Sequence, residues 1–203
     1  MTDNLRVLLT ETDRRAADHL AQEFESAGHE VHRCRDSGEP SFPCRGVAGP
    51  EPCPLEGGID VAVAYRAHPY PKPTTREDGI SCALRHEIPV VVAGQTGLNP
   101  FGEWTKATAP EGDAVSSAEW AARAPLARLT EIATGEARRM VRLFGIESGE
   151  AQADVFRDTR RLLVDLWVPG ELSRHDASRV AVRVADEVRR AAPHAGSVDV
   201  RLV

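Results

Sequence analysis

The chain is poor in aromatic side chains and in lysine, and it contains no long hydrophobic run. Aromatic residues make up 5% of its 203 residues. No stretch approaches the roughly 20 apolar residues that a membrane-spanning helix needs, and no N-terminal apolar segment resembles a signal peptide. These absences predict a cytoplasmic protein without a membrane span. The preference for arginine over lysine is typical of a high-GC bacterial source.

Positive charge is also scarce. Lys and Arg together number 25 against 31 Asp and Glu, which gives a net charge of −6. Nucleic acids and anionic membranes attract basic surfaces, so a nucleic-acid or membrane-surface role is disfavoured. In a reducing cytoplasm, cysteines are more often thiols or metal ligands than disulfides.

Common catalytic signatures are missing from the sequence. There is no H-E-x-x-H, no P-loop Lys-Ser/Thr and no arranged Ser, His and Asp. The run GQTGLNPFG at 94–102 has glycines after an expected strand, as phosphate loops do, but not the spacing of a nucleotide-binding loop. The sequence therefore favours a protein without catalytic activity, and it leaves ligand binding at the edge of an open sheet as an alternative.

Residues 5–107 alternate short apolar runs with amphipathic segments. The runs expected to be strands are 5–10, 29–33, 59–65, 90–93 and a weaker one at 103–107. Thr12 or Asp13 is expected to cap the helix after the first run, and a capping box of Thr75 and Asp78 to open a helix that continues to His86. Strands that alternate with helices predict an α/β fold with a doubly wound, mostly parallel sheet.

Small, turn-forming residues at 108–116 predict a boundary. We expect an α/β domain at 1–112, a helical linker at 113–145 whose main helix begins at Pro125, and a module at 146–203. The module is interpreted as strand, strand, helix, strand: a hairpin over 153–168 with its turn at 157–159, a helix capped by Ser173, and a last alternating strand. This order predicts a small α+β unit.

The first half resembles a response-regulator receiver domain, which has a flavodoxin-like sheet. The resemblance is carried by RVLLTETD, IDVAVAYRAHP and IPVVVAG, which stand where receivers place their paired acids, phosphorylated Asp and Ser/Thr switch residue. In this alignment the pocket positions hold Glu11, Thr12, Tyr65 and Gly94. A tyrosine cannot form an acyl phosphate, and Thr12 weakens the carboxylate cluster that would hold Mg²⁺. The resemblance therefore implies a pseudo-receiver that keeps the fold without the phosphoryl chemistry.

The last module is similar in topology and periodicity to C-terminal modules of alkaline-shock-type envelope stress proteins and of cation diffusion facilitators. The similarity is carried by LLVDLWVPGELSRHDASRVAVRVADEVRRA and VDVRLV. The facilitator module dimerises, so the resemblance implies a homodimer, and the amphipathic helix at 117–145 is another expected dimer face. The facilitators' metal ligands are not identifiable, because His175, Asp176 and His194 are too scattered.

Three of the four cysteines lie in an irregular, Pro/Gly-rich insertion at 34–58, and the fourth lies in the helix after the third strand. An irregular loop of this length inside a compact domain is usually functional or disordered. The loop has few apolar residues with which to fold by itself, namely Phe42, Val47 and Leu55. It therefore needs another anchor.

The cysteines are the candidate anchor, with the spacing Cys34-x9-Cys44-x8-Cys53-x28-Cys82. Four thiolates match the ligand count of tetrahedral Zn²⁺ or of a 4Fe–4S cluster. The pair Cys53-Pro54 leans toward iron–sulfur, and His32 and His86 are substitute ligands. A disulfide between Cys44 and Cys53, or four unrelated thiols, are the open alternatives.

Functions from different classes follow from these observations. The first is a non-catalytic regulatory or signalling protein, in which a cysteine-held metal or cluster orders the 34–58 loop and modulates binding of a protein partner. The second is a structural dimerisation adaptor whose cysteines are incidental. The third is a small-molecule-binding or enzymatic domain with its ligand near Thr10, Tyr65 and Gly94.

Overall fold

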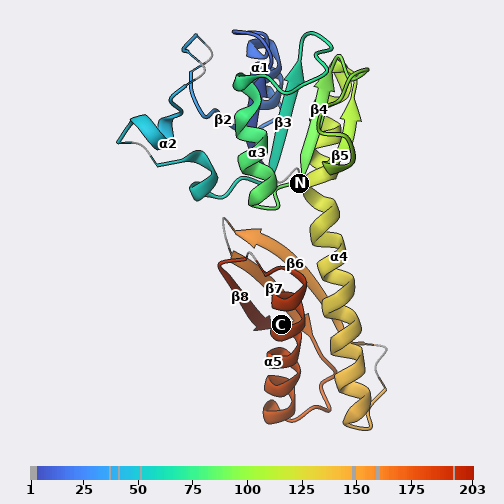
Figure 1. The fold of residues 1–203 in the computed structure, drawn as a ribbon. Helices are drawn as coiled ribbons and strands as arrows, with labels where there is room; N and C mark the ends of the chain where they lie inside the picture. Colours follow the sequence, from blue (N-terminus) through green and yellow to red (C-terminus); the bar gives the residue numbers. More distant parts are fainter. Residues whose placement is uncertain are drawn as a thin grey trace. The chain divides into compact units, whose positions relative to one another are not determined.

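The computed structural model describes residues 4–36, 38–40, 42–50, 52–147, 150–158, 161–193 and 195–203. The chain forms two compact units, Met1–Arg123 and Ala124–Val203. Figure 1 shows the ribbon of each unit. Within the described ranges, every helix is too short or too polar to cross a membrane.

The first unit is built on a five-stranded sheet in which all neighbouring strands are parallel. The strand order is β2-β1-β3-β4-β5, which is compatible with a receiver-like fold. The continuous apolar runs became strands because a parallel sheet is covered on both faces. The strands are β1 (Arg6–Glu11), β2 (Glu30–His32), β3 (Val61–Arg66), β4 (Val90–Gly94) and β5 (Thr105–Ala109).

One face of this sheet is covered by α1 (Asp18–Ser26) and by the first turns of α4 (Ala114–Leu143). Leu20 and Phe24 of α1 are fully buried there against Val7 and Val63. The helix begins at Asp18, later than the expected cap at Thr12 or Asp13, because the Glu11 carboxylate accepts the N–H groups of residues 15 and 17. The intervening residues therefore form a turn.

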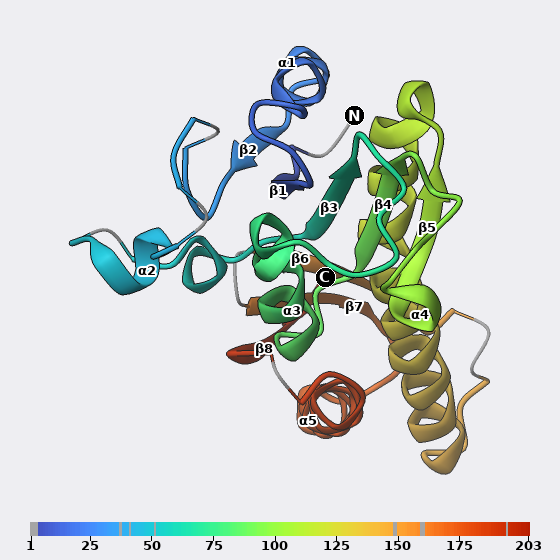
Figure 2. The ribbon, with the colours of Figure 1, turned by 45° about the horizontal axis from the view of Figure 1, so that its top comes forward.

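The other face is covered by α3 (Asp78–Arg85), which follows a 3₁₀ turn at Thr75–Glu77, and by the segment between β2 and β3. In its described residues that segment forms a single-turn helix, α2 (Arg45–Ala48), and a 3₁₀ turn at Pro54–Gly57. Figure 2 shows it in light blue and cyan, on the β2 side of the sheet. An irregular loop thus stands where a doubly wound sheet would have a long helix.

The second unit contains β6 (Gln152–Asp158), β7 (Arg161–Trp167), α5 (Arg174–Ala191) and β8 (Ser197–Leu202). The order strand, strand, helix, strand is the expected one, with β6 antiparallel to β7 and β7 parallel to β8. The Ser173 cap is confirmed, since its hydroxyl accepts the N–H of Asp176 at 3.1 Å. The turn expected at 157–159 was placed too early, because residues 157 and 158 belong to β6 and pair with Leu162 and Arg161 of β7. The noted His194 lies outside the described residues.

The start of the long helix was predicted wrongly. Helix α4 begins at Ala114 and continues through Pro125. A proline inside a helix lacks an N–H donor and costs roughly 3 kcal/mol relative to alanine. Buried residues before it, such as Ala118 and Ala121, and after it, such as Leu129 and Ala133, offset that cost.

Two smaller boundaries also differ from expectation. The capping contact before α3 involves Thr74 and Glu77, one residue earlier than predicted, because the Glu77 carboxylate accepts the Thr74 N–H at 2.8 Å. Strand β5 occupies Thr105–Ala109 instead of residues 103–107.

Candidate functional site

The thiol of Cys34 lies directly against α3. If Gly79 carried a Cβ, that atom would stand 2.9 Å from the Cys34 Sγ. Cys82 is three residues further along the same helix, and residues three apart share a helix face. Because Gly79 has no side chain, the Cys34 sulfur can approach the face of α3 on which Cys82 lies.

Contacts of helix α2 hold the other two cysteines, Cys44 and Cys53, near Cys34. Cys44 stands immediately before α2, and the N–H of Arg45 donates to the Cys34 carbonyl at 2.9 Å. Gly46 of the same turn packs against Cys53, where an added Cβ would stand 2.9 Å from the Cys53 Cβ. These backbone contacts hold the segments that carry Cys44 and Cys53 beside Cys34.

The four cysteines are free thiols, and each is half-buried. Burial first, and then the charges that Cys53, Cys44 and Cys82 carry when ionised, together raise the pKa of the Cys34 thiol to about 12. Such charge effects fade over a distance on the order of 10 Å in salt solution. Cys34 therefore shares one electrostatic environment with the three other thiols.

The four cysteines have the donor chemistry of a thiolate metal site, although their sulfur atoms do not lie close enough together to share one metal ion. In the part of the chain that the structure describes, no three Cys, His, Asp or Glu side chains are arranged to hold a metal ion as they stand. Thiolates held in one place repel each other, and a bound cation reverses that repulsion and keeps them deprotonated. The donor types fit Zn²⁺ or iron, provided that the sulfur atoms approach one another on binding.

The two histidines considered as substitute ligands are placed differently. His32 lies at the end of β2, where its Nε2 is 3.0 Å from Glu30, and burial lowers its pKa. His86 is an exposed residue just after α3. The four sulfurs remain the stronger donor set.

Hydrophobic burial gives the loop little support. Of its three larger apolar residues, Phe42 is 72% exposed and Val47 is 69% exposed, whereas Leu55 is 5% exposed and packs on the core with Ile59. The part of the loop around Cys44 therefore depends on polar and thiol contacts.

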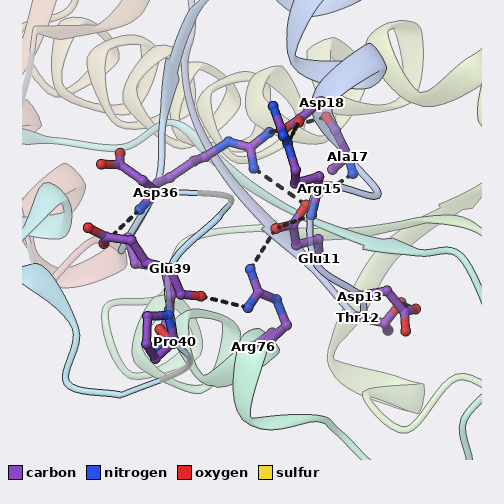
Figure 3. Close-up of polar contacts among 12 residues, drawn as sticks. Glu11, Thr12, Asp13, Arg15, Ala17, Asp18, Asp36, Glu39, Pro40 and Arg76 are labelled. Atoms are coloured by element: carbon purple, nitrogen blue, oxygen red, sulfur yellow. Dashed lines mark hydrogen bonds and ion pairs between the residues drawn. The ribbon is translucent and has the colours of Figure 1, made fainter.

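A charged network fills the sheet edge beside this loop. The Glu11 carboxylate accepts from the Arg76 guanidinium at 2.9 Å and from the Arg33 guanidinium at 3.4 Å, in addition to the two N–H groups before α1. Arg76 also donates to the Glu39 carbonyl at 3.0 Å, so it joins the loop to the end of β1. Figure 3 shows Arg76 between Glu11 and Glu39.

The receiver-type pocket positions are neighbours at the ends of β1, β3 and β4, since Glu11 pairs with Tyr65 and the Thr12 N–H donates to the Tyr65 carbonyl at 3.0 Å. Their side chains are engaged within the chain. The Thr12 hydroxyl donates to Asp13 at 2.7 Å, and the Tyr65 ring is buried in the core with an edge contact to His19 at 5.1 Å. Gly94 has φ +86°, and a Cβ on it would stand 2.6 Å from a backbone oxygen. The backbone itself thus excludes a switch hydroxyl at position 94.

Sequence reasoning missed a buried ion pair next to this edge. Arg66 and Glu77 are both fully buried and lie 3.0 Å apart, and Arg66 also donates to the Tyr70 carbonyl. Burial raises the pKa of Glu77, while its contacts with Thr74 and Arg66 oppose that rise. The available signal was an arginine at the end of an otherwise apolar run, which becomes the last residue of β3.

A scan against protein-family models finds no match for this chain, and a search of curated proteins finds none either.

Proposed function

We propose that the chain is a non-catalytic regulatory protein in which Cys34, Cys44, Cys53 and Cys82 bind a metal ion or an iron–sulfur cluster. The proposal rests on one observation. The Cys34 thiol lies against the face of α3 that also carries Cys82, and contacts of α2 hold the segments with Cys44 and Cys53 beside Cys34. A cation at this place supplies the loop with the anchor that its apolar residues do not provide. Structural metal binding commonly contributes several kcal/mol of folding free energy.

The ligand chemistry is four-sulfur coordination, which both Zn²⁺ and a 4Fe–4S cluster accept. The Cys53-Pro54 pair and the absence of a C-x2-C knuckle lean toward the cluster. Either group would act by position and charge, and the proposal includes no reaction at the site.

The regulatory part of the proposal rests on what the loop touches. Arg76 links the loop at Glu39 to Glu11 at the sheet edge, and Phe42 and Val47 are exposed on the loop. When the metal is bound, the loop is ordered and presents these apolar side chains in a fixed arrangement. Metal loss or thiol oxidation releases the loop and changes the surface offered to a protein partner.

Metal analysis of anaerobically purified protein tests the proposal. We expect near-stoichiometric zinc or iron in the wild-type chain, and its loss in Cys44→Ser. Val47→Ser alters the same short helix without removing a thiol, so it serves as the matched control and should keep the metal. An absorption band in the visible range distinguishes a cluster from zinc. Metal-free wild-type protein whose loop is still protected from proteolysis would contradict the proposal.

The second candidate function is a dimerisation adaptor whose cysteines have no functional role. Strand β8 favours this function, because it lies at the edge of its sheet and pairs with β7 on one side. In that case, replacement of all four cysteines by serine leaves melting temperature and self-association unchanged. The open-sheet enzyme is less well supported, because Glu11 and Arg66 at the strand ends are already paired with groups of the chain itself.

A further inference from the structure

The two edges of the second sheet differ. Along β6, side chains of α4 occupy the outward backbone groups: Thr134 accepts from the Ala153 N–H at 3.0 Å, and Arg138 donates to the Ala151 carbonyl at 3.0 Å. Thr130 likewise accepts from the Val155 N–H at 3.0 Å. Residues spaced by four form one stripe of a helix, so α4 closes this edge against another strand.

Strand β8 forms the opposite edge and pairs with β7 alone. The N–H of Val203 donates to Leu166 of β7 at 3.1 Å. Because successive residues of a strand direct their backbone groups to opposite sides, the odd-numbered residues of β8 face β7. Val198, Val200 and Leu202 therefore direct their N–H and C=O groups outward, and no hydrogen bond within the described chain reaches them.

The sequence of β8 complements itself in the antiparallel direction. If two copies of the strand pair with Val200 opposite Val200, the outward groups of all three even-numbered residues find partners. In this register Asp199 of each copy stands opposite Arg201 of the other, and both side chains are exposed. Shifting the register by two residues in either direction places Asp199 opposite Asp199, or Arg201 opposite Arg201, so that like charges face each other and both opposite-charge pairs are lost. Opposite charges across a strand pair stabilise it.

We propose that two copies of this chain dimerise by antiparallel pairing of their β8 strands, which produces one continuous six-stranded sheet. The pairing is isologous, as expected for a twofold dimer, and it removes an unprotected edge that otherwise invites uncontrolled association. It covers backbone next to Leu202 and Val203, which are 43% and 61% exposed. The proposal is independent of the thiol site.

Sedimentation equilibrium of the full chain at increasing concentration provides the test. We expect the wild type to reach twice the mass of a single chain. Val200→Pro removes an N–H group that has no partner within the described chain, and proline is tolerated at such edge positions, so this variant should fold and remain a monomer. Leu143→Ser, an exposed position on α4, is the control and should still dimerise.

A charge exchange tests the register. Asp199→Arg places like charges opposite each other in a homodimer, and so does Arg201→Asp, whereas a mixture of the two variants restores both opposite-charge pairs. We expect each variant alone to be a monomer and the equimolar mixture to dimerise. Arg201→Asp also loses the ion pair between Arg201 and Asp165. The folding of the Arg201→Asp variant is therefore checked first by circular dichroism. If Arg201→Asp does not fold, the Val200→Pro variant decides the test. A monomeric wild type, or a Val200→Pro chain that dimerises, overturns the proposal.

Discussion

The sulfur of Cys34 lies 2.9 Å from the point where a side chain on Gly79 would begin, and the Thr10 methyl group lies 3.1 Å from the same point. Alanine is preferred over glycine in a helix by about 1 kcal/mol, so the helix alone would gain from Gly79→Ala. We expect the opposite result, because the added methyl group forces the Cys34 thiol away from α3. The variant should melt at a lower temperature and retain less metal than the wild type.

Gly135→Ala is the matched control for this substitution. Gly135 lies within α4, and apart from its chain neighbours and the adjacent backbone of its own helix, no atom of the described residues stands within 4 Å of the Cβ that it would carry. This variant should be stabilised by up to about 1 kcal/mol in urea unfolding, with its metal content unchanged. If both alanine variants are stabilised equally, Cys34 is not held where the thiol site requires it.

The buried pair of Arg66 and Glu77 predicts a large stability effect. Glu77→Gln keeps an oxygen that can accept the Thr74 N–H but leaves the fully buried Arg66 charge unpaired. Removing one partner of such a pair typically costs about 3–5 kcal/mol, and denaturant unfolding should show a loss of this order. Adding Arg66→Met to Glu77→Gln should recover part of the loss. A double variant whose loss equals the sum of the two single losses would show that the two residues are not coupled.

The sequence predicted the sheets better than the site. The runs around Val63 and Val91 could be assigned as strands because burial on both faces leaves a continuous apolar pattern. The start of α4 could not be assigned, because proline usually marks a first turn and the burial that tolerates Pro125 comes from tertiary packing. The sequence indicated a shared cysteine site, but the approach of Cys34 to Gly79 depends on a contact between distant segments that spacing does not encode.

Glu136 predicts an acid-sensitive contribution to stability. Hydrogen bonds from Arg139, together with the charges of Arg139 and Arg183, lower the pKa of this carboxyl. A lowered folded-state pKa stabilises the folded chain above the unfolded value of about 4.3, and this contribution disappears as the pH falls through the folded value. The difference in unfolding free energy between wild type and Glu136→Gln should therefore shrink as the pH falls below about 4. A difference that is the same at neutral and acidic pH would contradict this assignment.

The pocket positions predict that the chain does not accept a phosphoryl group. Tyr65 is buried in the core, and Glu11 is held by the Arg33 and Arg76 guanidinium groups. Incubation with acetyl phosphate and Mg²⁺ should leave the intact mass unchanged, with a phosphorylatable receiver as the positive control. A gain of one phosphoryl group that hydroxylamine removes would show that an acyl phosphate forms.

The most direct test of the central claim is the sulfur coordination of the metal in the anaerobically purified chain. X-ray absorption spectroscopy at the zinc or iron edge reports the type and number of ligands. The account predicts a shell of sulfur atoms at about 2.3 Å, four per zinc ion, that is lost in Cys44→Ser. A wild-type chain without metal, or a metal surrounded by nitrogen and oxygen alone, would contradict it.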